Sequence, residues 1–138
     1  MYHFTIKSSN TSASLTFCER DGDYYSVIYD SPAIKLKKRV WGYSDGGLLV
    51  DLFAYIAKQW KGWDGLQTWG SIEEDFGLSA SCDHLGHVML HLSFIENDGP
   101  EVWQAKVDIG LDSGQMDEVA DNVRHFFRDK CLNMLSIK

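Results

Sequence analysis

Apolar and polar residues alternate through residues 2–41 of the chain. Residues 2–6, 13–17, 24–29 and 33–41 form four such runs, and the turn-forming residues Ser, Asn, Asp, Gly and Pro separate them. Successive side chains of a strand point to opposite faces, so a period of two indicates a strand. This region therefore predicts an antiparallel meander of four strands.

The apolar spacing changes after residue 44. A period of 3.6 over residues 45–60 predicts an amphipathic helix. Its apolar stripe comprises Leu48, Leu49, Leu52, Phe53, Ile56, Ala57 and Trp60. Gly62 suits the left-handed residue that often ends a helix. Residues 61–69, KGWDGLQTW, mix glycines and aromatic residues in no regular period, so they predict an ordered loop.

Alternation returns in residues 76–82 and 88–94, with the turn sequence Asp83-His84-Leu85-Gly86 between them. This arrangement predicts a β-hairpin. Residues 103–109 predict one more strand, and Asp112 or Ser113 can cap a final helix whose apolar face ends at Phe127. Strands grouped apart from helices indicate the α+β class. We expect a single domain over residues 1–138, with an antiparallel sheet of about seven strands and two helices.

The chain has 138 residues and a formal net charge of −7. This charge opposes the phosphate backbone of nucleic acid and favours a basic protein partner. No stretch approaches the roughly 18 apolar residues that would cross a bilayer, and the first ten residues lack a signal-peptide pattern. We expect a cytoplasmic protein that binds neither nucleic acid nor a membrane. Its oligomeric state is left open.

Gly42-Tyr43-Ser44-Asp45-Gly46 matches the GxSxG pattern of a serine nucleophile. The strand before it, KLKKRVW, carries charge on one face, whereas a nucleophile elbow follows a strand that is buried on both faces. The same residues suit a helix N-cap at Ser44 or Asp45. We therefore expect no catalytic residue here.

Cys82, His84 and His87 lie close together in the sequence and resemble part of a metal site. They are too few, and the alternation directs Cys82 toward the core, so we expect no metal and no other cofactor. Cys18, Cys82 and Cys131 are widely spaced, which predicts reduced, structural thiols. Lys35, Lys37 and Arg39 share one strand face, which we interpret as a solvated surface.

Three tryptophans, Trp60, Trp63 and Trp69, lie within ten residues of one another, next to Gly62, Gly65 and Gly70. Such spacing indicates indoles packed over a tight backbone turn. It fits a small satellite core at one end of the sheet, and it also fits a preorganised aromatic binding surface.

Three segments carry a resemblance to a known family: WKGWDGLQTW at residues 60–69, LSASCDHLGHVMLHLSF at 78–94 and the final GLDSGQMDEVADNVRHFF. Over roughly residues 45–127 the chain resembles an uncharacterised bacterial family, domain of unknown function six-two-two-eight. The N-terminal strands are similar in pattern alone. The resemblance implies no catalytic residues, and small acidic domains of this kind are similar in class to immunity proteins of toxin systems.

The leading hypothesis is a non-catalytic protein-binding module, of the immunity type, that neutralises a basic toxin by occlusion. The predicted partner-binding residues are Trp63, Asp64, Trp69, Glu73, Glu74 and Asp75. The alternative is a small-molecule-binding domain or small enzyme that uses residues 60–70 as a pocket wall. Its polar contacts would be His84, His87 or Asp64. A pocket of convergent polar groups favours the alternative, and a flat or convex acidic surface favours the protein-binding module.

Overall fold

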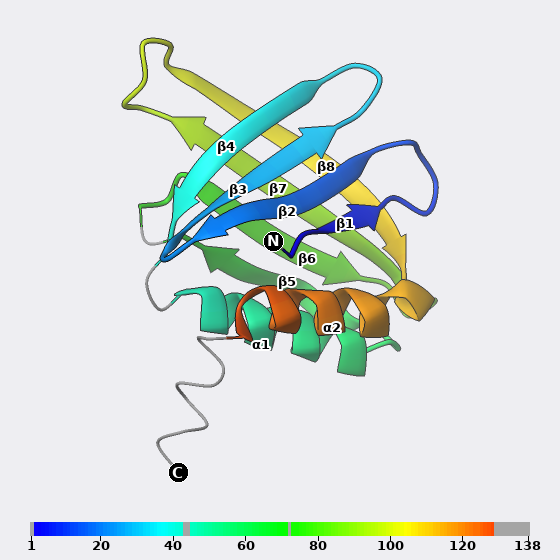
Figure 1. The fold of residues 1–138 in the computed structure, drawn as a ribbon. Coiled ribbons are helices and arrows are strands. Elements are labelled where there is room, and N and C mark those ends of the chain that lie inside the picture. The colour runs from blue at the N-terminus through cyan, green and yellow to red at the C-terminus, as the bar shows by residue number, and fades with distance from the viewer. Residues whose placement is uncertain (1, 43–44, 72, 129–138) are drawn as a thin grey trace.

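The chain repeats one order of elements, four strands followed by a helix (Figure 1). The computed structural model describes residues 2–42, 45–71 and 73–128. The first half contains β1 (Phe4–Lys7), β2 (Ser14–Asp21), β3 (Tyr24–Asp30), β4 (Lys35–Trp41) and α1 (Asp45–Lys58). The second contains β5 (Trp63–Gly70), β6 (Phe76–Cys82), β7 (His87–Glu96), β8 (Trp103–Asp112) and α2 (Met116–Phe126), which follows a 3₁₀ turn.

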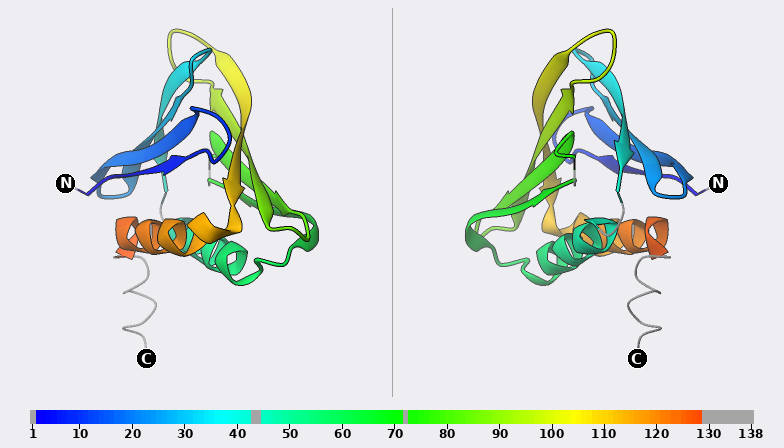
Figure 2. Two further views of the ribbon diagram at one scale, coloured as in Figure 1. Left: turned by 90° about the vertical axis from the view of Figure 1, so that its right-hand side faces the viewer. Right: turned by 90° about the vertical axis from the view of Figure 1, so that its left-hand side faces the viewer.

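The strands form two antiparallel sheets, each with its strands in chain order. The two sheets approach each other along one side and diverge toward the helices, which close the wide base between them (Figure 2). The α+β class and the antiparallel pairing are confirmed. The single sheet of about seven strands becomes two sheets of four, because β5 is an additional strand and no strand of one half pairs with the other half among the described residues.

The prediction of an ordered loop over residues 61–69 is wrong, because most of this segment is strand β5. Gln67 to Gly70 pair regularly with Ala80 to Gly77, and Trp63 pairs with Cys82. The pairing is irregular between Trp63 and Gln67, where Gly65 has a φ of 75°. Such an irregularity inserts unpaired residues, so it conceals the period of two that identifies a strand.

The core lies between the two sheets and the helix pair. Phe17 of β2 meets Phe76 of β6 edge to face, with ring centroids 6.1 Å apart. Phe76 in turn contacts Phe94 of β7, and Phe126 of α2 lies against Phe17. Aromatic side chains bury a large apolar area and prefer such edge-to-face contacts, so this cluster joins both sheets to the helical base.

Each helix packs on the sheet of the other half. The indole N–H of Trp69, in β5, donates a hydrogen bond to the backbone oxygen of Asp45 at the start of α1, at 2.9 Å. At the other side, Arg20 of β2 donates to the backbone oxygen of Phe126 in α2, at 2.7 Å. The two halves are therefore interlocked, since each supplies the helix that covers the sheet of the other.

Lys38 of β4 joins the two sheets through ion pairs. Its side chain points inward and is 9% exposed. The ammonium lies 3.2 Å from Glu96 Oε1 in β7 and 3.6 Å from Asp75 Oδ2 in the β5–β6 turn. Its neighbours Lys35, Lys37 and Arg39 are exposed on the opposite face of β4, as the alternation predicted.

Candidate functional site

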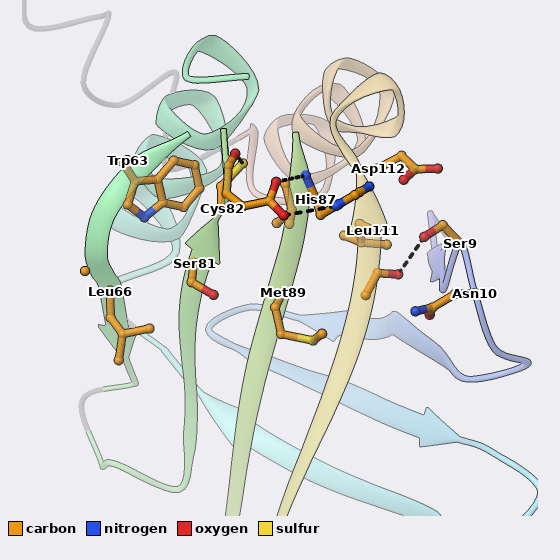
Figure 3. Close-up of a pocket in the computed structure, with 14 residues that line it drawn as sticks. Ser9, Asn10, Trp63, Leu66, Ser81, Cys82, His87, Met89, Leu111 and Asp112 are labelled. Atoms are coloured by element: carbon orange, nitrogen blue, oxygen red, sulfur yellow. Dashed lines mark hydrogen bonds and ion pairs between the residues drawn. The ribbon is translucent and has the colours of Figure 1, made fainter. Parts of the chain in front are cut away.

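A hollow of about 820 Å³ lies on the outer face of the second sheet, near the β6–β7 turn (Figure 3). Trp63 and Leu66 of β5 stand on one side of it, and Ser9 and Asn10 of the β1–β2 loop on the other. Met89 of β7 lies between them. The site therefore combines strands β5 to β8 with a loop of the first sheet.

Strand register explains why this face is hollow. Ser81, Met89 and Gly110 form one row across β6, β7 and β8, and their side-chain positions face outward. The small residues in this row leave space beside the long side chain of Met89. At the β8 end, a Cβ on Gly110 would lie 3.1 Å from Asn10 Oδ1, and the oxygen of Gly110 accepts the N–H of Ser9 at 2.9 Å. The loop wall is thus held against β8.

Trp63 is fixed in place at the edge of the hollow. Its indole N–H donates to the backbone oxygen of Ala80 at 3.2 Å, and its ring meets Tyr55 of α1 edge to face at 5.7 Å. Trp63 is half-buried, whereas Leu66 beside it is 58% exposed. A partner that enters the hollow would meet a rigid aromatic side chain and an accessible aliphatic one.

Asp83 anchors the β6–β7 turn. Its Oδ1 accepts the backbone N–H groups of His87 and Leu85, each at 2.9 Å, and its Oδ2 lies 3.0 Å from His87 Nδ1. The N–H of His87 is the first of the donors that lower the pKa of this carboxyl below its ordinary value. Hydrogen bonds to the charged form have this effect, so Asp83 is a carboxylate at neutral pH.

The comparison with protein families decides what the chain belongs to. The sequence model described as "Family of unknown function (DUF6228)" matches residues 6–130. The chain is a member of the DUF6228 family. The resemblance seen in the sequence is confirmed, and the match extends it to the N-terminal strands. No curated protein matches the chain significantly.

The DUF6228 chain does not gather its six predicted partner-binding residues on one surface. Trp63 and Asp64 begin strand β5, and Asp64 is exposed beside the hollow. Glu73, Glu74 and Asp75 lie beyond the other end of that strand, which at about 3.3 Å per residue is more than 20 Å away. Glu73 and Glu74 are exposed, whereas Asp75 accepts the hydroxyl of Ser71 at 2.6 Å and faces Lys38.

Trp69 lies in the core and is 6% exposed. Its ring meets Phe76 edge to face at 5.6 Å, in addition to its bond to Asp45. The two tryptophans of this segment therefore differ: Trp69 belongs to the core, and Trp63 borders an open surface. We leave Trp69 out of the candidate site, because a partner does not reach it in this conformation.

The polar residues of the alternative hypothesis lie around two adjacent hollows. Asp64, His84 and Trp63 line a smaller hollow of about 410 Å³ next to the first one, and Asp83 borders both. His87 lines the larger hollow. The β6–β7 turn thus brings together the residues that the sequence had proposed as pocket contacts.

The metal, thiol, serine and membrane hypotheses have separate outcomes. No group of three His, Cys, Asp or Glu side chains in the described ranges is placed to hold a metal ion. Burial is the main cause that raises the pKa of the Cys82 thiol. Ser44 and Cys131 lie outside the described residues. None of the described helices is long and apolar enough to cross a membrane.

Sequence reasoning missed the outer face itself. The outward positions of β6 are Gly77, Ser79 and Ser81, whereas a solvated strand usually carries large polar or charged side chains there. Ser93 and Gly110 continue this pattern in β7 and β8. Small outward residues on three adjacent strands were the available signal.

Proposed function

We propose that this DUF6228 chain is a protein-binding module that receives a basic partner on the outer face of β5–β8. Occlusion of the partner, as by an immunity protein against a toxin, is the form of this function that we favour. The observation that carries the proposal is that Trp63, Leu66 and Met89 lie on the open outer face of the sheet, beside the carboxylates of Asp83 and Asp112.

This combination suits protein recognition on physical grounds. Binding energy at interfaces concentrates in a few aromatic and apolar anchors, and polar groups around them exclude water. The half-buried indole of Trp63 is already ordered, so binding costs little side-chain entropy there. The net charge of −7 attracts a basic protein over a distance of about 8 to 10 Å at physiological salt.

Selection from a random peptide library displayed on phage tests the proposal. We expect enriched peptides to be rich in Lys and Arg, and to bind more slowly as salt is added. Trp63→Ala should weaken binding at least about tenfold, mainly through faster dissociation. Trp60→Ala is the matched control, because this exposed indole lines neither hollow. Enriched peptides whose binding is unchanged by both Trp63→Ala and added salt would refute the proposal.

The volume of the hollow and its polar lining favour a second function, binding of a small molecule, which is the alternative that such a pocket supports. Ligand pockets commonly measure about 300 to 1,000 Å³ and combine an apolar wall with a few polar groups. Trp63 with His87 and Asp83 meets that description. Native mass spectrometry separates the two functions. A constant added mass that disappears in Trp63→Ala but remains in Trp60→Ala would favour the small molecule.

A further inference from the structure

On the outer face of the second sheet, paired residues of neighbouring strands form rows, and the charged residues lie in some of these rows and not in others. His87 of β7 lies opposite Asp112 of β8, and Asp83 adjoins them across the turn. Two residues further along β8, the row contains Gly110 and no charge. The row after that is composed of Thr68, Ser79, His91 and Asp108.

Asp112 and Asp108 are therefore two outward carboxylates on one strand, four residues apart. At about 3.3 Å per residue their Cα atoms are separated by roughly 13 Å. Asp108 lies 2.9 Å from His91 through its Oδ1, and its side chain is still 60% exposed. Asp112 is also exposed, at the start of the 3₁₀ turn, where it forms a capping box with Gln115. Both carboxylates are thus accessible.

The row between them has Met89 in its centre, with Leu66 at the β5 side of the hollow. At its β8 end, Asn10 of the β1–β2 loop lies over Gly110. Beyond Asp108 a second hollow, of about 420 Å³, continues on the same face over Gly77, Ser79 and Ser93. The small outward residues of β6 thus border both hollows, which leaves room for a chain that runs over β6 and β7, from where long basic side chains reach the carboxylates of β8.

Resting on the proposed function, we propose that the occupant is an extended segment of the partner with the pattern basic, any, apolar, any, basic. In an extended chain, residues i, i+2 and i+4 point to one side, and i and i+4 are about 13 Å apart. The two basic side chains meet Asp112 and Asp108, and the apolar one meets Met89 and Leu66. Lys106, one row past Asp108, disfavours a third basic residue at i+6.

Two blocked peptides of one composition test this pattern against general charge attraction. Arg-Ser-Leu-Ser-Arg has the proposed spacing, and Arg-Arg-Ser-Leu-Ser has the same residues in another order. Titration of the full chain, followed by its backbone amide NMR shifts, gives the dissociation constants. We expect the first peptide to bind at least about fivefold more tightly, with shifts at Ser81, Met89 and Gly110.

Charge-neutral variants identify the groups involved. Asp108→Asn and Asp112→Asn should each remove the preference between the peptides, and Asn retains helix-capping ability at position 112. Asp30→Asn is the matched control, because it removes one charge from the other sheet and should leave the preference intact. Equal affinity for both peptides, no binding of either, or shifts confined to other faces would each overturn the inference.

The two proposals fail in different ways. If the library yields salt-dependent binders that need Trp63, while the two peptides bind equally or not at all, the protein-binding function stands and the spacing is wrong. If the library yields no such binder, the protein-binding function itself fails.

Discussion

Two tryptophans of one short segment have different environments. Trp63 borders an open hollow, whereas Trp69 is enclosed by Phe76 and the start of α1. Their spacing in the sequence identified both as packed against a tight backbone. It did not separate their roles, because burial of Trp69 depends on α1 lying beside β5, which is a tertiary contact.

Truncation of Trp69 should destabilise the fold. Trp69→Ala removes a buried indole and a hydrogen bond, and we expect a loss of about 3 to 5 kcal/mol in the free energy of unfolding. Urea unfolding at 25 °C measures it. Trp60→Ala, at a side chain that is 57% exposed, should change the free energy by less than about 1 kcal/mol. Equal stability of the two variants would contradict the core position of Trp69.

Asp83 should make stability depend on acid pH. Hydrogen bonds lower the pKa of Asp83 in the folded state, so the ionised carboxylate stabilises the fold. This stabilisation is fully present above the unfolded pKa of about 3.9, and it is lost as the pH falls through the lower folded pKa. Asp83→Asn lacks this contribution. The difference in unfolding free energy between the two proteins should therefore shrink as the pH falls from about 5 toward 2. Urea unfolding at a series of pH values checks it, and a difference that stays constant to pH 2 would contradict it.

At the scale of elements, regular alternation was sufficient for the prediction of seven strands and of the hairpin β6–β7. Strand β5 was missed because its irregular pairing at Gly65 interrupts the period of two. Gly62 has the positive φ that the sequence predicted, 99°, but α1 ends four residues earlier, at Lys58, so Gly62 is not the residue that ends the helix. A residue that needs a positive φ can be predicted from the sequence, whereas an edge strand with irregular pairing is identified only once its partner strand is known.

The connection from α1 to β5 should tolerate no side chain at residue 62. A Cβ on Gly62 would lie 2.5 Å from the backbone oxygen of Asp83, in addition to the cost of a positive φ. We expect Gly62→Ala to lower the unfolding free energy by about 2 to 4 kcal/mol.

Gly65→Ala provides the control for that variant. It also has a positive φ, but no atom lies within 4 Å of its Cβ position. It should cost only about 1 to 2 kcal/mol. Equal losses for Gly62→Ala and Gly65→Ala, measured by urea unfolding, would show that the contact with Asp83 is unimportant.

At the scale of the whole molecule, the inward or outward direction of side chains was predictable, and the division into two sheets was not. The alternation placed Lys35, Lys37 and Arg39 on one face, which leaves Lys38 on the inner face. Its partners Asp75 and Glu96 come from distant parts of the sequence. The hollow was missed for the same reason, since its walls come from β5, β7 and the β1–β2 loop.

The charge of Lys38, more than the volume of its side chain, should contribute to the free energy of unfolding. Lys38→Ala leaves two facing carboxylates without their cation, and we expect a loss of about 1 to 3 kcal/mol in the free energy of unfolding. Lys38→Met should cost less, because its apolar side chain fills the space. Lys37→Ala is the surface control and should cost less than about 1 kcal/mol, since the Lys37–Glu19 pair is half exposed. A loss for Lys38→Ala no greater than for Lys37→Ala would contradict this role.

Because each helix packs on the sheet of the other half, the chain is a natural candidate for fragment complementation. A cut between α1 and β5 yields two pieces of four strands and one helix, and each piece lacks the helix that packs on its own sheet. Each piece alone therefore exposes apolar surface that its counterpart covers. Fused to two interacting proteins, the pieces would regain a complete core only when brought together, which is the behaviour required of a split reporter.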